Sequence, residues 1–194
     1  SVALAATDLG LYVVAMTIEG PLFLAVTTME LLLFPKIAQQ SQEGGRQAVL
    51  GRYFRAALLI VIPATIGFIA LAPWLIGTVF GDAYLPAADP ARILALSGIA
   101  YTLKVMLTTY MRASNRMRIV AQSEGLGIVV TIGALAVLLP LFGLIGAAIA
   151  QVIAFTIPAL FMVAAMITWA TTDAGFHWLG GASLGMAVAI VASL

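Results

Sequence analysis

Residues 125–172 read GLGIVVTIGALAVLLPLFGLIGAAIAQVIAFTIPALFMVAAMITWATT, a run of 48 residues without Asp, Glu, Lys or Arg. A second uncharged run of 25 residues covers 56–80. About 20 consecutive apolar residues are enough for an α-helix to cross the hydrocarbon core of a bilayer. These two stretches therefore predict an all-α protein that crosses the membrane several times.

The composition of the whole chain supports this interpretation. Charged residues make up 9% of the 194 residues and hydrophobic residues 63%, and the mean hydropathy is +1.13. A soluble domain carries roughly a quarter charged residues. The net charge of +1 gives no reason to expect a nucleic-acid partner, and the absence of cysteine excludes disulfides.

Hydropathy and turn residues divide the chain into expected spans. We expect five full spans and a truncated sixth, at about 12–35, 56–80, 93–111, 119–139, 145–169 and 180–194. The chain begins at Ser1, and its last apolar stretch is shorter than a full span. We therefore interpret residues 1–194 as a single transmembrane bundle that forms part of a longer transporter.

Two connections between the expected spans carry glycine. Pro140, Gly143 and Gly146 predict a tight turn between the fourth and fifth spans. Gly44 and Gly45, within the polar segment QQSQEGGRQAVLGRYFR, predict an exposed loop or amphipathic connector before the second span.

The basic residues of the loops predict the orientation in the membrane. Seven of them lie in two alternate loops, at Lys36, Arg46, Arg52, Arg55, Arg112, Arg116 and Arg118. The opposite side holds only Arg92. Cytoplasmic loops carry the excess of Lys and Arg in membrane proteins. We therefore expect 36–55 and 112–118 to face the cytoplasm, and 81–92 and 140–143 to face outward.

Three sequence segments, in this order along the chain, resemble the C-terminal half of polysaccharide and O-antigen flippases. These flippases belong to the multidrug/oligosaccharidyl-lipid/polysaccharide exporter superfamily. The segments are LGLYVVAMTIEGPLFLAVTTMELLLFPKIAQ at 9–39, RYFRAALLIVIPATIGFIALAPWLIGTVFGDAYLPAADPARILALS at 52–97, and PLFGLIGAAIA at 140–150. The features shared with the family are Gly-Leu-Tyr at the start of the first segment, Phe-Pro where that segment enters a loop, a proline in the middle of an expected span, and a Phe-Gly turn. The resemblance covers residues 9–169.

This resemblance implies a fold, a function and partners. Such exporters have about twelve to fourteen helices in two bundles around a central cavity, and they flip undecaprenyl-pyrophosphate-linked sugars across the cytoplasmic membrane. The chain is then most of the C-terminal bundle, and its partners are the N-terminal half, membrane lipids and a lipid-linked oligosaccharide. The family has no catalytic signature, so the resemblance implies a transporter and not an enzyme.

Lys104 is the candidate substrate-binding residue with the most informative position. It lies eight residues from Arg112, about 12 Å from that helix end at 1.5 Å per residue. A cation at this depth costs a few kcal/mol against lipid, so we expect it to face a cavity or a partner. The alternatives are a cavity cation for a pyrophosphate or acidic sugar, an ion pair with Glu19, and snorkelling to the cytoplasmic face.

Other candidates accompany Lys104. Glu19 precedes Gly20 and Pro21, where a kink would place it beside the cavity; hydrogen bonding between helices is the alternative. Tyr101 is a candidate for stacking on sugar rings, although an interfacial or packing role competes with this.

Two further sets of charged residues lie nearer the cytoplasmic side. Arg52 and Arg55 are expected at the cytoplasmic mouth, to anchor the helix at anionic headgroups or to attract an anionic lipid substrate. Two other carboxylates, Glu30 and Glu124, are expected to form structural pairs, with Lys36 and Arg118 respectively.

No motif predicts enzymatic chemistry. We find no nucleophile–base arrangement, metal cluster or phosphate loop in the sequence, and hence no cofactor or metal is expected. A polysaccharide polymerase would need a larger outward loop with reactive polar residues than the outward turns offer. The remaining alternatives are a cation-coupled multidrug exporter and a lipid II flippase of the same superfamily.

Overall fold

In a computed structural model, the backbone is described for residues 6–172 and the side chains for 9–168, apart from Glu43. The described chain is helical and contains no strand, as the sequence predicted. Its elements are α1 (Ala6–Ala38), α2 (Glu43–Val79), the short 3-10 helix η1 (Asp82–Ala87), α3 (Ala88–Ala113) and α4 (Met117–Thr172). The expected span at 180–194 lies outside the described residues.

Four of these helices are long and apolar enough to cross a membrane. The most apolar 18-residue window of α4 has a mean hydropathy of 2.7, yet none of it is buried. Ile128, Val129 and Leu141 on this helix are each more than 60% exposed. An apolar surface of this extent is stable against lipid and not against water. The chain is therefore a multi-pass membrane protein, although the predicted count of five or six spans is not confirmed.

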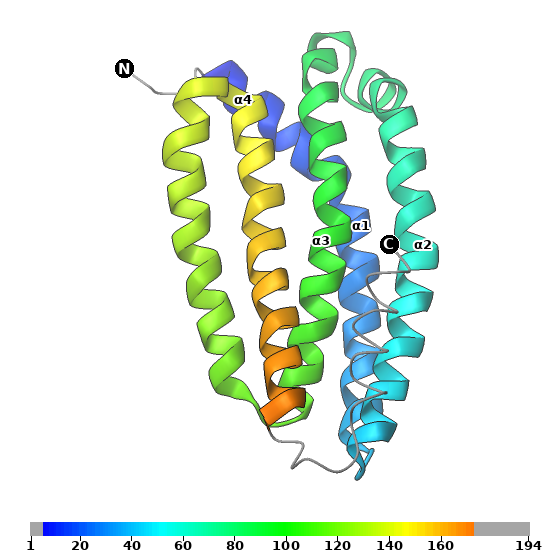
Figure 1. The fold of residues 1–194 in the computed structure, drawn as a ribbon. Coiled ribbons are helices and arrows are strands. Elements are labelled where there is room, and N and C mark those ends of the chain that lie inside the picture. Colours follow the sequence, from blue (N-terminus) through cyan, green and yellow to red (C-terminus); the bar gives the residue numbers. More distant parts are fainter. Residues whose placement is uncertain (1–5, 173–194) are drawn as a thin grey trace.

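α4 is far longer than one span because it folds back on itself. Gly143 has φ 55° and ψ −129°, a conformation outside the helical region. Figure 1 shows that the chain reverses near the top of the view, so that two arms, 117–142 and 144–172, run side by side. A side chain on Gly146 would meet the backbone oxygen of Leu138, so the turn needs glycine there as well. The turn predicted around Pro140 is present.

α3 is the central helix of the bundle. It packs against α1, α2 and α4. Of the 18-residue apolar segment that could cross the membrane, 61% is buried in α3, against 22% in α1 and 28% in α2. One apolar cluster joins α1, α2, α3 and α4 around Leu33, Phe54 and Met106. A second, smaller cluster lies around Ala15, Ile76 and Leu94. Side chains that point from α3 therefore reach every other helix.

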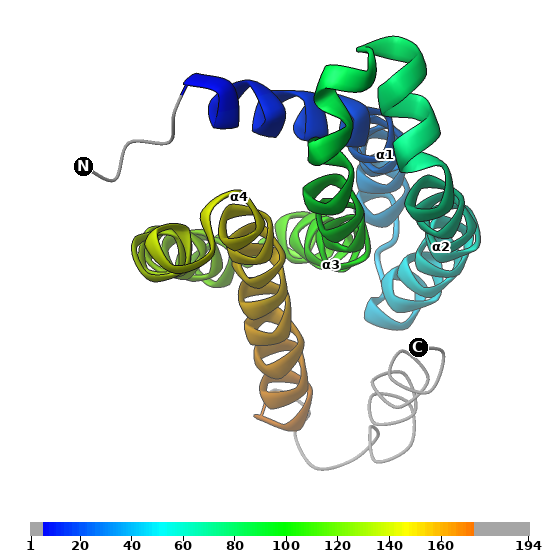
Figure 2. The same ribbon diagram turned by 90° about the horizontal axis from the view of Figure 1, so that it is seen from above.

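The prolines inside α1 and α2 do not end these helices. Gly20 and Pro21 lie within α1, where proline and glycine together favour a bend. Figure 2 shows the first part of α1 running across the end of the bundle before the helix turns down beside α2. In α2, Pro73 has no N–H for the carbonyl of Ile69 four residues earlier. The Arg92 Nε donates to that carbonyl oxygen at 3.1 Å and ties α3 to α2 there.

The basic segments gather at one end of the bundle. Figure 1 shows the α1–α2 and α3–α4 connections at the bottom of the view, and η1 and the α4 reversal at the top. We call the first of these the basic end, because the residues at and beside its connections include Lys36, Arg46, Arg112, Arg116 and Arg118. Gly44 and Gly45, expected in a loop or connector, lie in the first turn of α2, so the true connection is only 39–42.

Candidate functional site

Glu19 is the centre of a buried hydrogen-bond network between three helices. Its side chain is fully buried. Ser97 Oγ of α3 donates to Glu19 Oε1 at 2.6 Å, and Gln151 Nε2 of α4 donates to Glu19 Oε2 at 3.2 Å. Tyr12 OH donates in turn to Gln151 Oε1 at 3.2 Å. The network satisfies each polar group that it buries and links α1, α3 and the second arm of α4.

An ion pair between Lys104 and Glu19 was one alternative that the sequence left open, and the structure does not contain it. The Lys104 Nζ lies 2.9 Å from Oε2 of Glu124, so the ion pair joins α3 to the first arm of α4. The Lys104 side chain is 15% exposed and that of Glu124 is 44% exposed. The expected partner of Glu124 was Arg118, and this was wrong. The pair lies in the bundle at about the depth that the sequence predicted for Lys104.

Three aromatic rings adjoin this ion pair. Phe23 of α1, Tyr101 of α3 and Phe155 of α4 have centroids 4.5 to 5.9 Å apart. The Lys104 Nζ lies 5.8 Å from the centroid of Phe155, within cation–π range. Ser97, Tyr101 and Lys104 follow one another at i, i+4 and i+7, so they share one face of α3. Tyr101 thus lies between the Glu19 network and the ion pair.

Glu30 is tied to α3 nearer the basic end. Thr109 Oγ1 donates to Glu30 Oε1 at 3.1 Å, and Arg112 approaches the same oxygen at 3.5 Å. The expected partner was Lys36, so this pairing was also wrong. Both errors have one cause. The true partners lie on other helices, whereas Lys36 and Arg118 are neighbours of Glu30 and Glu124 along the chain.

Arg52 and Arg55 are exposed near the start of α2. Arg55 Nε approaches the carbonyl oxygen of Gly51, one turn earlier in the same helix, at 3.4 Å. Arg52 and Arg55 follow Glu43 by nine and twelve residues, about 14 and 18 Å along α2 by helical rise. The structure does not bring these two residues together with Lys104, Tyr101 or Glu19.

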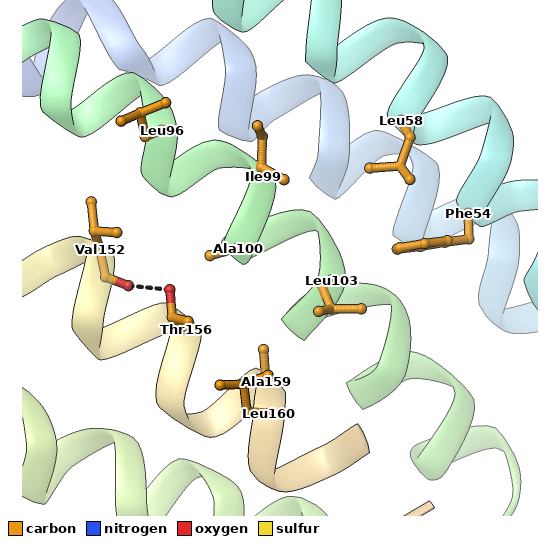
Figure 3. Close-up of a pocket in the computed structure, with 10 residues that line it drawn as sticks. All are labelled: Phe54, Leu58, Leu96, Ile99, Ala100, Leu103, Val152, Thr156, Ala159 and Leu160. Carbon is orange, nitrogen blue, oxygen red and sulfur yellow. Dashed lines mark hydrogen bonds between the residues drawn. The ribbon is translucent and has the colours of Figure 1, made fainter. Parts of the chain in front are cut away.

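Two of the hollows lined by described residues lie beside α3, and their linings differ. The first, which we call the polar pocket, has a volume of about 270 Å³ and is lined by Lys104, Glu124 and Phe155 among others. The second, the apolar groove, has a volume of about 310 Å³ and runs between α2, α3 and the second arm of α4. Figure 3 shows that its one hydroxyl, on Thr156, is directed to the carbonyl of Val152. Of these two hollows, the polar pocket is the one lined by charged groups.

Ser97 and Gln151 belong to the site but were not among the sequence candidates. Gln151 is the one amide in the 48-residue uncharged run, and a polar side chain in such a run needs a partner within the bundle. This feature of the sequence was sufficient to identify Gln151 as a candidate site residue. Within the described residues no group of three or more His, Cys, Asp or Glu side chains is placed to hold a metal ion.

Comparisons with known proteins agree with these features. Residues 2–89 match the model of a family described as polysaccharide biosynthesis protein. Over 154 residues the chain is 25% identical to a protein named as a probable low-salt glycan biosynthesis flippase of Haloferax volcanii. The aligned part is 78% of this chain but 33% of that relative, so the chain spans about a third of the relative's length. No solved structure matches the chain.

The two matches agree with each other and with the helical membrane bundle, because flippases are polytopic membrane proteins. The family match covers α1, α2 and η1, and the flippase match extends over most of the chain. Together they confirm the resemblance to polysaccharide flippases that the sequence indicated.

Proposed function

We propose that the chain is the C-terminal bundle of a flippase that moves a lipid-linked oligosaccharide across the cytoplasmic membrane for polysaccharide biosynthesis. The similarity to a named glycan biosynthesis flippase supports a transporter rather than an enzyme. In this proposal the carrier is undecaprenyl pyrophosphate, and the oligosaccharide passes while the prenyl tail stays in lipid. The two arms of α4 then cross the membrane separately, which makes five full spans.

The Lys104–Glu124 ion pair is the observation that carries this proposal. Lys104 lies about 12 Å from the basic end of α3 and Glu124 about 9 Å from Arg118, by helical rise. Glu124 is nevertheless 44% exposed. A half-exposed carboxylate at this depth is costly against lipid chains. The face of the bundle that carries it therefore borders a hydrated cavity or another part of the protein, as expected of a two-bundle transporter.

The candidate residues take separate roles in this proposal. Arg52 and Arg55, exposed on α2, attract the diphosphate from the cytoplasmic side. Lys104 and Tyr101 meet the substrate in the cavity. Glu19 is fully buried in this arrangement, so its contact with substrate requires α1 to separate from α3 and α4 during transport.

Alternating access explains how two bundles move the substrate. Rocking of one bundle against the other opens a fixed central site first to one side and then to the other. The N-terminal half of the transporter supplies the second wall of that site. Residues 1–194 alone have one wall, and we expect them not to transport.

Complementation tests this function. The full-length transporter, expressed in a strain that lacks its own polysaccharide flippase, should restore surface polysaccharide and lower the accumulated lipid-linked oligosaccharide. Residues 1–194 alone, at matched membrane abundance, should do neither. Failure of the full-length protein in strains that supply its own glycan would contradict the flippase assignment. Restoration by residues 1–194 alone would contradict the two-bundle mechanism.

A further inference from the structure

The polar pocket is a built hollow between three helical segments. Lys104 comes from α3, Glu124 and Thr131 from the first arm of α4, and Phe155 from the second arm. The two arms approach closely here: a side-chain carbon on Gly127 would lie 3.3 Å from Pro158. The pocket therefore depends on the reversal of α4, which brings residues 124–132 beside 154–155.

The charges of the pocket select against an anion. Lys104 and Glu124 form a pair with no net charge, and the carboxylate is the more exposed partner. A phosphate that approached the ammonium would meet this carboxylate within a few ångströms, where like charges repel strongly at low dielectric constant. A diphosphate is thus a poor ligand for the pocket as it stands.

The same two groups suit a neutral ligand that carries several hydroxyls. A carboxylate is purely a hydrogen-bond acceptor and an ammonium purely a donor, whereas a hydroxyl is both. Adjacent hydroxyls can therefore bond to Glu124 and Lys104 together. The hydroxyl of Thr131 donates to the carbonyl of Gly127 at 2.7 Å, and its oxygen can still accept.

The aromatic side chain that lines the polar pocket, and the volume of the pocket, restrict the class of ligand further. Phe155 lines the pocket and is held by edge and tilted contacts to Phe23 and Tyr101, so its ring has a fixed position. An aromatic ring offers an apolar surface to the C–H groups of a sugar, beside the polar groups that bond its hydroxyls. Pockets for drug-sized ligands measure about 300–1,000 Å³, so 270 Å³ is suited to a single ring.

We propose that the polar pocket binds one uncharged sugar residue of the transported glycan, with its hydroxyls on Lys104 and Glu124 and its C–H surface on Phe155. This inference rests on the proposed flippase function and adds a subsite to it. The diphosphate is bound elsewhere, and the pocket recognises the glycan part of the substrate.

The cysteine-free chain allows a direct binding test. Ile132 lines the pocket and is 64% exposed, whereas Val129, 69% exposed on the same helix, does not line it. In the purified full-length transporter, Ile132→Cys or Val129→Cys is alkylated by a soluble maleimide. The test ligands are methyl pyranosides of glucose, galactose, mannose and N-acetylglucosamine, with inorganic pyrophosphate as the anionic ligand.

At a concentration ten times its Kd, a bound pyranoside should slow alkylation at position 132 about tenfold, because only the free pocket reacts. Position 129 should be unaffected. The protection should be lost in Glu124→Gln and in Phe155→Leu, the second of which keeps an apolar side chain and so the fold. Pyrophosphate should protect neither position.

Three results overturn the inference: no pyranoside protects position 132, pyrophosphate protects it better than any pyranoside, or both positions are protected equally. Complementation separates this inference from the proposed function. A transporter that restores polysaccharide without pyranoside protection contradicts the sugar subsite alone. Protection in a protein that fails to restore polysaccharide contradicts the flippase function alone.

Discussion

The Nζ of Lys104 and the Oε2 of Glu124 lie 2.9 Å apart and connect the central helix α3 to the first arm of α4. The two residues are 20 positions apart in sequence, on either side of the α3–α4 connection. Each charge makes the other tolerable within the membrane-spanning bundle, because an unpaired ion at this depth is costly. The pair therefore has a structural role whatever its part in transport.

A double-mutant cycle measures that structural role. Lys104→Ala and Glu124→Ala should each lower the thermal stability of the detergent-solubilised protein, because each leaves an unpaired charge. The double variant should recover most of the loss, with a coupling energy of about 1 kcal/mol, since the pair is partly exposed. Additive losses from the two single changes would show that the pair does not stabilise the bundle.

The Glu19 network should make a larger contribution to stability. Glu19→Ala removes the acceptor of both Ser97 and Gln151 and should lower the free energy of unfolding by about 2–4 kcal/mol. Ser97→Ala removes one bond and should cost about 1 kcal/mol. The matched control is Thr102→Val, because the hydroxyl of Thr102 bonds only to the Gly98 carbonyl of its own helix. Denaturant titration of the three variants gives the comparison, and an effect of Glu19→Ala no larger than that of the control would refute the network's importance.

The contact between Arg92 and the Ile69 carbonyl compensates for Pro73. Arg92→Ala should therefore destabilise the protein by about 1–2 kcal/mol by leaving a carbonyl without a donor. In a Pro73→Ala background the helix supplies its own N–H, and the same change should cost much less. Asp89→Ala is the control, since it removes the exposed partner of Arg92 and leaves the carbonyl contact in place. Equal costs of Arg92→Ala in both backgrounds would contradict this explanation.

The orientation predicted from the basic residues can be tested with single cysteines. Gly44 and Met117 stand at the basic end, and Ala83 and Phe142 at the opposite end. Met117 is a better position for the cysteine than Asn115 in the connection before it, because Asn115 has a φ of 58°, which asparagine tolerates better than cysteine. An impermeant thiol reagent on intact cells should label positions 83 and 142, and should label 44 and 117 only after permeabilisation. Labelling of 44 or 117 in intact cells would reverse the topology.

The sequence predicts the class of fold well because membrane helices leave a strong local signal. Long uncharged runs, proline and glycine at 140–146, and the clustering of Arg and Lys are all visible without any tertiary contact. The helix that begins at Glu43 was harder to place, because its first turns are polar and are stabilised by the rest of α2.

The site is only partly predictable for a related reason. The depth of Lys104 marked it as a residue that needs a partner, but the identity of that partner depends on how α4 packs on α3. Glu19 and Gln151 are 132 positions apart and meet only because the α4 reversal returns the second arm to α1 and α3. Local reasoning finds the polar residues of such a bundle and not their pairing.

Export of the polysaccharide tests whether Lys104 meets the transported substrate. Surface polysaccharide and membrane abundance should be measured together for Lys104→Ala, Lys104→Arg and the double variant Lys104→Ala with Glu124→Ala, in the full-length transporter. We predict that Lys104→Arg retains part of the export and that the double variant reaches normal abundance while export stays strongly reduced. Normal export from the double variant at normal abundance would contradict this contact and leave Lys104 a purely structural partner of Glu124.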